Sequence, residues 1–179
     1  MAPSTPAGPS VREIPEGDNR ERLICPDCGF INYENPRVVV GSVCSWQDRL
    51  LLCRRAIEPR RGYWTIPAGY LELHESAEDG AMREAREEAR AEIVIDGLIA
   101  VYTIPRISQI QLIYRAGLAG GRFEAGEETL EAGLFGWDDI PWDDLAFPSV
   151  RWALNHWREI AGERSWPPFA NPPGEDGNY

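Results

Sequence analysis

The stretch from Gly69 to Ala91 reads GYLELHESAEDGAMREAREEARA, and it decides both the fold and the chemistry expected of this chain. Within it, Glu84, Glu87 and Glu88 are spaced i, i+3 and i+4, so a helix places the three carboxylates on one face. Carboxylates that lie this close repel one another. A divalent cation relieves the repulsion, because hard carboxylate oxygens suit Mg²⁺ or Mn²⁺. The stretch therefore predicts a metal-binding helix.

Local signals support the helix. Ser76 is the expected N-cap, and Asp79 three residues later completes a pair that resembles a capping box. Glu75 is expected to brace Arg83 or the preceding loop instead of binding metal. The carboxylates are expected to face a cleft, and another face of the helix is expected to pack on a sheet. The residues of that face are Ala77, Ala81, Met82, Ala85 and Ala89.

The alternative interpretation is a solvated helix, since runs of charged residues are usually solvated faces. The fixed offsets among the glycine, the isolated glutamate and the Arg-Glu-x-x-Glu-Glu cluster disfavour it. A strand-like apolar run over residues 64–68 directly precedes them. These features together favour a functional site.

The stretch resembles the box of the Nudix hydrolase family, G-x5-E-x7-R-E-U-x-E-E-x-G-U, in which U is aliphatic. The matching residues are Gly69, Glu75, Arg83, Glu84, Ala85, Glu87, Glu88 and Ala91. Arg90 stands in the place of the second glycine, which ends the helix in the family, so the exit of this helix is left open. The resemblance implies an α/β fold with a mixed sheet (α+β), the Nudix α/β/α sandwich, preceded by a short degenerate zinc-ribbon-like segment.

Composition agrees with a globular enzyme. The chain has 179 residues, 43% of them hydrophobic, and a formal net charge of −11. All 18 basic residues are arginine, which excludes sites built on a P-loop or Schiff-base lysine. The acidity argues against a nucleic-acid partner, and no apolar run is long enough for a membrane span. The N-terminus has neither a basic start nor an apolar stretch, so we expect no signal peptide and a cytoplasmic protein.

Four regions are expected along the chain: a flexible arm over 1–20, a zinc-ribbon-like remnant over 21–36, the Nudix domain over 37–162, and an extended or disordered tail over 163–179. Within the third region, strands are expected over 38–44, 50–55, 64–67, 92–104, 108–116 and 131–137. A glycine-rich connection is expected over 117–126, and a closing helix over 150–160.

The four cysteines form two unlike pairs. Cys25 and Cys28 have the Cys-x-x-Cys spacing of half a zinc site, but a second such pair is missing. Cys44 and Cys53 lie inside strand patterns and are expected in the core. Residues 14–38 resemble a Nudix subgroup whose N-terminal zinc ribbon has a further Cys-x-x-Cys before this segment, where prolines and serines stand here. The favoured interpretation is a remnant that packs without zinc; the alternatives are zinc within one chain or zinc shared by two chains.

The resemblance to this subgroup continues through residues 51–69, 102–109 and 134–142. Its members hydrolyse nucleoside diphosphates linked to another moiety, notably ADP-ribose, FAD and NADH. The Pro/Phe-rich signature of the NADH-specific branch is not found after the box. The resemblance therefore implies a small dinucleotide or nucleotide-sugar substrate, ADP-ribose or FAD above all, with release of AMP. It also implies a homodimer.

The resemblance implies that Glu84, Glu87 and Glu88, with the backbone carbonyl of Ala68 or Gly69, hold Mg²⁺, for which Mn²⁺ can substitute. A further carboxylate from a distant loop is expected as metal ligand or general base. Glu128 is favoured for that role and Glu131 comes second, while the other candidates are Glu124 and Glu127.

Substrate contacts are expected from Arg54, Arg55, Arg106, Gln109 and Tyr102. Arginine suits phosphate because its planar fork donates two parallel hydrogen bonds. The plainer interpretation of the two adjacent arginines is surface pairing with the excess of acids.

Two rival functions are open. One is a catalytically silent ADP-ribose sensor on the same scaffold, which the three intact glutamates disfavour. The other is a zinc-ribbon adaptor for nucleic acid or protein, which the missing cysteine pair and the acidity disfavour.

Overall fold

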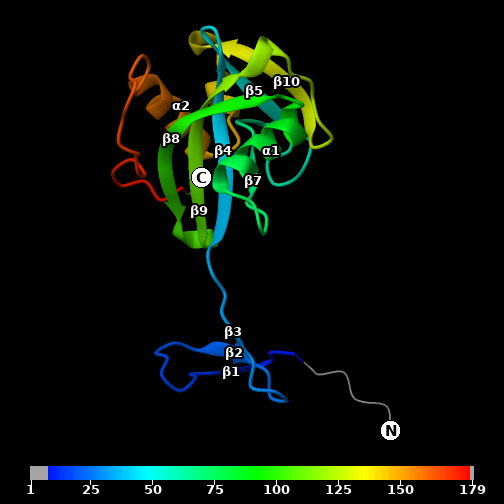
Figure 1. Ribbon diagram of the computed structural model, residues 1–179, viewed down its shortest axis with the longest axis vertical. Coiled ribbons are helices and arrows are strands. Elements are labelled where there is room, and N and C mark those ends of the chain that lie inside the picture. The colour runs from blue at the N-terminus through cyan, green and yellow to red at the C-terminus, as the bar shows by residue number, and fades with distance from the viewer. Residues whose placement is uncertain (1–7, 178–179) are drawn as a thin grey trace. The chain divides into compact units, whose positions relative to one another are not determined.

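The computed structural model describes residues 8–177, which form two compact units that divide after Asn35 (Figure 1). The first unit is a three-stranded antiparallel sheet in the order β1-β2-β3. Its strands are β1 (Val11–Glu13), β2 (Arg22–Ile24) and β3 (Ile31–Asn32). The flexible arm expected through residue 20 is thus wrong for residues 11–13, because β1 pairs with β2. The part of that arm before residue 8 lies outside the described residues.

The Cys-x-x-Cys segment of the first unit is a tight turn. Cys25 is buried and Cys28 is exposed, and the Gly29 amide donates to the Cys25 carbonyl at 2.9 Å. Amide groups of Asp27 and Cys28 that donate to the Cys25 sulfur lower the pKa of this thiol. Among residues 8–177, no third histidine, cysteine or acidic side chain joins the pair in a metal-binding cluster.

The second unit contains a seven-stranded mixed sheet and two α-helices. The main path of the sheet runs β10-β5-β4-β9-β8, with β6 beside β5 and β7 beside β4; β4 and β9 are parallel and the other pairs are antiparallel. The strands are β4 (Arg37–Trp46), β5 (Arg49–Arg55), β6 (Trp64–Thr65), β7 (Ala68–Tyr70), β8 (Ile93–Ile104), β9 (Gln109–Leu118) and β10 (Thr129–Gly136). The helices are α1 (Ala77–Ala89), α2 (Pro148–Glu159) and four short 3₁₀ turns, η1 (Pro105–Ile107), η2 (Ala119–Gly121), η3 (Trp137–Asp139) and η4 (Trp142–Asp144).

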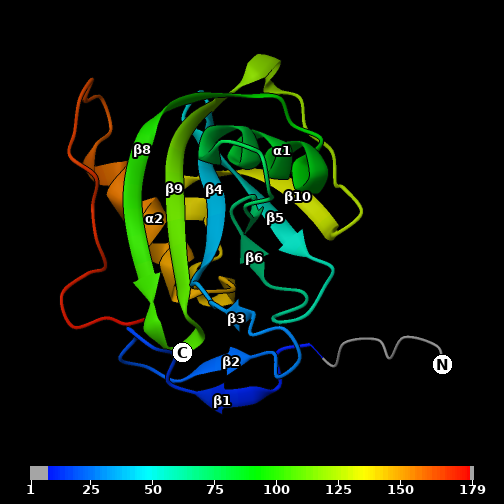
Figure 2. The same cartoon turned by 60° about the horizontal axis from the view of Figure 1, so that its bottom comes forward.

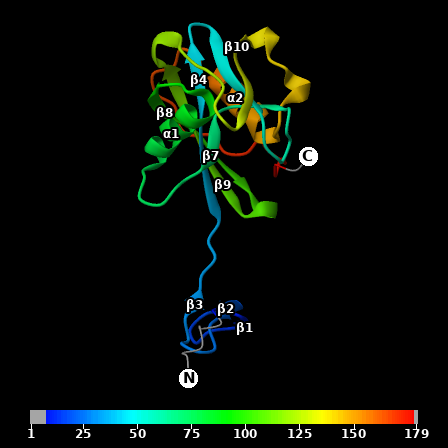
Figure 3. The same cartoon turned by 90° about the vertical axis from the view of Figure 1, so that its right-hand side faces the viewer.

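The two α-helices cover opposite faces of the sheet (Figure 2; Figure 3). Side chains alternate along a strand, so each strand supplies both faces. In β5, Leu50 and Leu52 pack in the same core as α2, whereas Leu51 and Cys53 pack with the alanines of α1. The α/β/α sandwich is confirmed, and Cys44 and Cys53 lie in its core as expected.

Helix α1 begins and ends at defined caps. The Ser76 hydroxyl oxygen accepts the Asp79 amide at 3.1 Å, which confirms the expected N-cap. At the other end, Arg90 takes a left-handed conformation with φ 46° and ψ 30°. Its amide donates to Arg86, and the Ala91 amide donates to Ala85. Arginine therefore makes the helix exit that glycine makes in the family motif.

Helix α2 starts two residues before the expected boundary because Pro148 fits the first turn, where no amide donor is needed. The tail is extended but ordered over the described part. Phe169 pairs with β8 through a parallel bridge to Ala100, so the alternative of disorder is wrong there. No helix among the described residues has the length and apolar character to cross a membrane.

We predict that Arg90→Gly raises the melting temperature of the second unit, with a gain of about 0.5–1 kcal/mol in free energy of unfolding. A left-handed residue with a Cβ is strained, and glycine removes that strain. The measurement is thermal unfolding followed by tryptophan fluorescence, since all seven tryptophans lie in this unit. Arg90→Ala is the control, because it keeps the Cβ. Equal melting temperatures for the two variants would contradict the prediction.

Candidate active site

A cleft of about 830 Å³ opens in the second unit beside the carboxylate face of α1. Its walls come from the strands β4 to β9, from α1 and η1, from the loops around residues 57–59 and 127–128, from the first turn of α2, and from Gly177. The residues that carry the expected metal site all line it: Ala68, Gly69, Glu84, Glu87, Glu88 and Glu128.

Two of the carboxylates on α1 are buried. Glu84 and Glu88 are 8% and 7% exposed, and both side chains reach β7. Glu88 Oε2 accepts the Ala68 amide at 3.0 Å. The Glu84 carboxylate lies so close to Gly69 that a Cβ on that residue would stand 2.3 Å from Oε1. The first glycine of the motif is therefore required because it lets a carboxylate approach the backbone.

Burial changes how these carboxylates ionise. Desolvation raises the pKa of Glu84, and it raises the pKa of Glu88 to about 8. The negative charges of Glu84 and Glu128 raise the pKa of Glu88 further. The same repulsion from Glu128 acts on Glu84. The cleft thus gathers three carboxylates whose negative charges are mutually unfavourable.

Arg83 organises the mouth of this acidic cluster. Its guanidinium donates to Glu84 at 2.7 Å and to Glu87 at 2.9 Å, and also to the Tyr70 carbonyl at 2.9 Å. Two further bonds join it to Glu75, at 3.1 and 2.9 Å. The hydrogen bond from Arg83 lowers the pKa of Glu75 to about 2. Glu75 braces Arg83, as expected.

The donor set fits a hard divalent cation. Desolvated carboxylates that repel one another are the oxygen ligands such an ion prefers, and its charge would offset theirs. In the described part of the chain, however, no three such side chains converge on one point. Two of the carboxylates, those of Glu84 and Glu87, accept hydrogen bonds from Arg83.

The loop before β10 brings Glu128 to the cleft. The Gly126 amide donates to the Glu88 carbonyl at 3.0 Å, and the Ala56 amide donates to the Glu128 carbonyl at 2.8 Å. A Cβ on Gly126 would stand 1.7 Å from the Glu87 carbonyl oxygen, so this approach requires glycine. Glu131 pairs instead with Arg54 at 3.7 Å and does not line the cleft.

The two adjacent arginines separate. Arg55 lines the cleft, and its guanidinium lies 5.2 Å from the centre of the Phe147 ring. Arg54 lies outside the cleft lining and donates to the Gly62 carbonyl at 2.9 Å. Successive residues in a strand point to opposite sides, so the two could not share one site. The expected substrate contact by Arg54 is corrected accordingly.

Arg106 and Gln109 line the cleft from η1 and β9, whereas Tyr102 does not. Tyr102 is fully buried, and its hydroxyl lies 2.7 Å from His156 Nδ1. No face of its ring is open to a substrate, so the expectation for Tyr102 is wrong.

Sequence reasoning did not identify Gln111 or Phe147, which also line the cleft. Alternation in β9 is a signal for Gln111, because it lies two residues from Gln109 and donates to it at 2.8 Å. Phe147 precedes the first turn of α2 and had no signal of its own.

Comparisons with known proteins agree with this geometry. The family model described as NUDIX domain matches residues 35–146, and the model described as Nudix N-terminal, a zinc ribbon, matches residues 7–34. An ADP-ribose pyrophosphatase from Methanocaldococcus jannaschii is 29% identical over 119 residues, which are 64% of this chain and 69% of that protein. An NAD-capped RNA hydrolase from Pseudomonas fluorescens is 31% identical over 140 residues, 75% of this chain but 48% of that longer protein.

Among solved structures, a NUDIX hydrolase from Nitrosomonas europaea is 44% identical to this chain, with a TM-score of 0.84. The match covers 90% of this chain and 93% of that one. The domain model spans more than half of the chain and includes the residues that form the sheet, α1 and most of the cleft lining. The chain therefore belongs to the Nudix hydrolase family.

Proposed function

We propose that the protein is a Mg²⁺-dependent pyrophosphohydrolase that cleaves the diphosphate of a nucleoside diphosphate linked to another moiety. ADP-ribose or FAD is the proposed substrate and AMP a product, and Mn²⁺ can replace Mg²⁺. The observation that carries the proposal is the burial of Glu84 and Glu88 in a cleft that also receives Glu128. Such a cluster of repelling carboxylates is stabilised by a divalent cation, which a diphosphate substrate also requires.

The size and charge of the cleft support a dinucleotide-like substrate. A volume of about 830 Å³ lies at the upper end of the range of about 300–1,000 Å³ for small-molecule sites. Arg55 and Arg106 bring positive charge to parts of the cleft away from the acidic face of α1. The relative from Methanocaldococcus jannaschii bears the name ADP-ribose pyrophosphatase, which agrees with this substrate class.

Each residue has a role in this proposal. Glu84, Glu87, Glu88 and the Ala68 carbonyl would hold the cation, with Glu128 as a further ligand or as the base that accepts a proton from water. A bound Mg²⁺ would neutralise the charge of the diphosphate and acidify the attacking water. Arg55 and Arg106 would hold phosphate oxygens, and Gln109 would donate to the ribose. Arg83 orients Glu84 and Glu87 through its hydrogen bonds.

The second candidate is a binding protein for ADP-ribose without catalysis. The hydrogen bonds of Arg83 favour it, since they occupy two of the three carboxylates proposed to bind metal on α1, those of Glu84 and Glu87. A panel of ADP-ribose, FAD, NADH and a nucleoside triphosphate, assayed with Mg²⁺ and read by product identity, separates the two. AMP from ADP-ribose or FAD supports the hydrolase, whereas binding without products supports the sensor.

We also propose that the protein is a cytoplasmic homodimer. Light scattering of the purified protein tests its oligomeric state.

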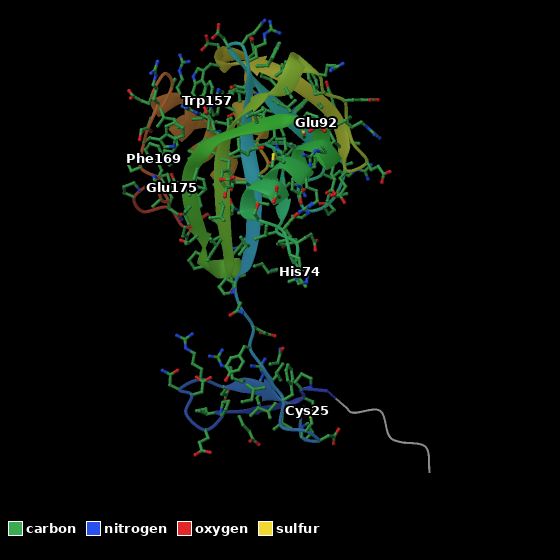
Figure 4. All side chains as sticks on the ribbon, in the orientation of Figure 1. Cys25, His74, Glu92, Trp157, Phe169 and Glu175 are labelled. Carbon is green, nitrogen blue, oxygen red and sulfur yellow. The ribbon has the colours of Figure 1, made fainter. Side chains whose placement is uncertain are left out.

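We predict that Glu88→Gln lowers kcat by at least about a thousandfold, because it removes a charged metal ligand. The melting temperature should not fall, since the amide oxygen of glutamine can still accept from the Ala68 amide and the variant no longer buries a carboxylate. Glu92→Gln is the matched control: Glu92, labelled in Figure 4, pairs with Arg86 and lies outside the cleft lining. Full activity in Glu88→Gln would show that the site is wrongly assigned.

Glu128→Gln should slow turnover by at least about tenfold, as loss of a ligand or a base does. Glu131→Gln should retain the parental rate, because Glu131 pairs with Arg54 away from the cleft. Steady-state kinetics of both variants decide between the two glutamates. Equal losses in both, or a loss in Glu131→Gln alone, would contradict the choice of Glu128.

Without metal, stability should fall as pH rises from about 4.5 to about 8. Burial raises the pKa of Glu88 from its ordinary value of about 4.5 to about 8, so the folded state binds more protons than the unfolded state in that window. Denaturant unfolding at several pH values measures how the free energy of unfolding of the metal-free protein changes with pH. Glu88→Gln should flatten this dependence, and Mg²⁺ should stabilise the parent most at the alkaline end. A slope identical in parent and variant would contradict the assignment.

A further inference from the structure

The segment over residues 166–177, here called the C-terminal strap, adds a partial strand to the outer edge of β8. The Phe169 amide donates to Ile99 at 2.8 Å, and the Val101 amide donates to Phe169 at 2.9 Å. The Phe169 ring stacks on His156 of α2 with centroids 4.1 Å apart. Phe169 and Glu175 both lie beside β8 (Figure 4). The strap is therefore fixed to the sheet and to α2.

Side chains extend this attachment toward the end of β8. Asn171 acts like a peptide group: its Oδ1 accepts the Thr103 amide at 2.9 Å, and its Nδ2 donates to the Thr103 carbonyl at 2.8 Å. The same Nδ2 donates to the Glu175 carbonyl at 3.1 Å, and Glu175 Oε2 accepts the indole N–H of Trp152 at 2.7 Å. These bonds hold the strap at the last residues of β8.

The strap then reaches the cleft. Gly177 is buried, and a Cβ on it would stand 2.4 Å from Cδ1 of Ile104. Gly177 and Ile104 both line the cleft, and so do Arg106 and Ile107 of the adjoining turn η1. A segment that only covered the free edge of β8 would have no need to continue beyond Thr103. The strap therefore both covers the edge of β8 and, through Gly177 beside Ile104, forms part of the cleft lining.

We propose that the C-terminal strap is an end wall of the substrate cleft that limits the size of the moiety attached to the nucleoside diphosphate. It acts as a positioning element: Asn171 fixes Thr103, and the strap backbone at Gly177 packs against Ile104, the residue before the η1 turn. This proposal rests on the proposed hydrolase function. A fixed wall at this end favours ADP-ribose over the larger FAD.

The test compares kcat/KM for FAD with kcat/KM for ADP-ribose in the parent and two variants. Asn171→Ala removes both hydrogen bonds to Thr103 and should raise the ratio of kcat/KM for FAD to kcat/KM for ADP-ribose at least about fivefold. The change should lie in KM, and kcat should stay near the parental value. Gly177→Leu places a side chain that does not fit against Ile104, at a φ of 81°. It should displace the strap and raise the ratio by a similar factor. Asn155→Ala, on the exposed side of α2, is the matched control and should keep the parental ratio.

Hydrogen exchange of the Val101 and Phe169 amides reports strap displacement independently of activity. A parental ratio in both variants overturns the proposal, whatever the exchange shows and however much the melting temperature falls. A lowered melting temperature with an unchanged ratio would show edge protection alone. If the unaltered protein hydrolyses neither compound, the proposed function fails instead, so the two failures are distinct.

Discussion

The burial of Glu84 and Glu88 on one face of α1 is the constraint on which the rest of the structure depends. Removing carboxylates from water is costly, and a second negative charge nearby increases the cost. The surrounding chain is arranged to allow it: glycine at position 69 lets a carboxylate meet the backbone, and the Ala68 amide donates to Glu88. A fold that needed only a stable helix would place alanine or leucine at these positions.

Arg83 shows how the chain tolerates this acidic face. One guanidinium binds Glu75, Glu84 and Glu87, so a single cation holds the loop before α1 to the helix and offsets part of the negative charge. Glu88 is not among the carboxylates that Arg83 binds, and desolvation by burial raises its pKa to about 8. The two buried carboxylates are thus unequal, and the deeper one retains the strongest preference for an added positive charge.

Sequence patterns predicted the parts of the structure that local chemistry determines. The i, i+3, i+4 spacing and the Ser76 cap specify α1, and the apolar runs specify the strands. The patterns could not decide which of Arg54 and Arg55 faces the cleft, because strand register is set by pairing with β10 and β6. Tyr102 was misjudged since an aromatic residue fits a core and a binding site equally well. The docking of the strap depends on contacts 68 residues apart, such as Asn171 with Thr103, which no local pattern reveals.

The most direct measurement of the central claim is calorimetric titration of the metal-free protein with Mn²⁺ near pH 7, in buffers of different ionisation enthalpy. Buried carboxylates with raised pKa values must lose protons when a cation binds. The account predicts saturable binding with release of protons, and loss of both in Glu88→Gln but not in Glu92→Gln. The account would be contradicted if the parent bound no Mn²⁺. It would also be contradicted if Glu88→Gln bound Mn²⁺ and released protons to the same extent as Glu92→Gln.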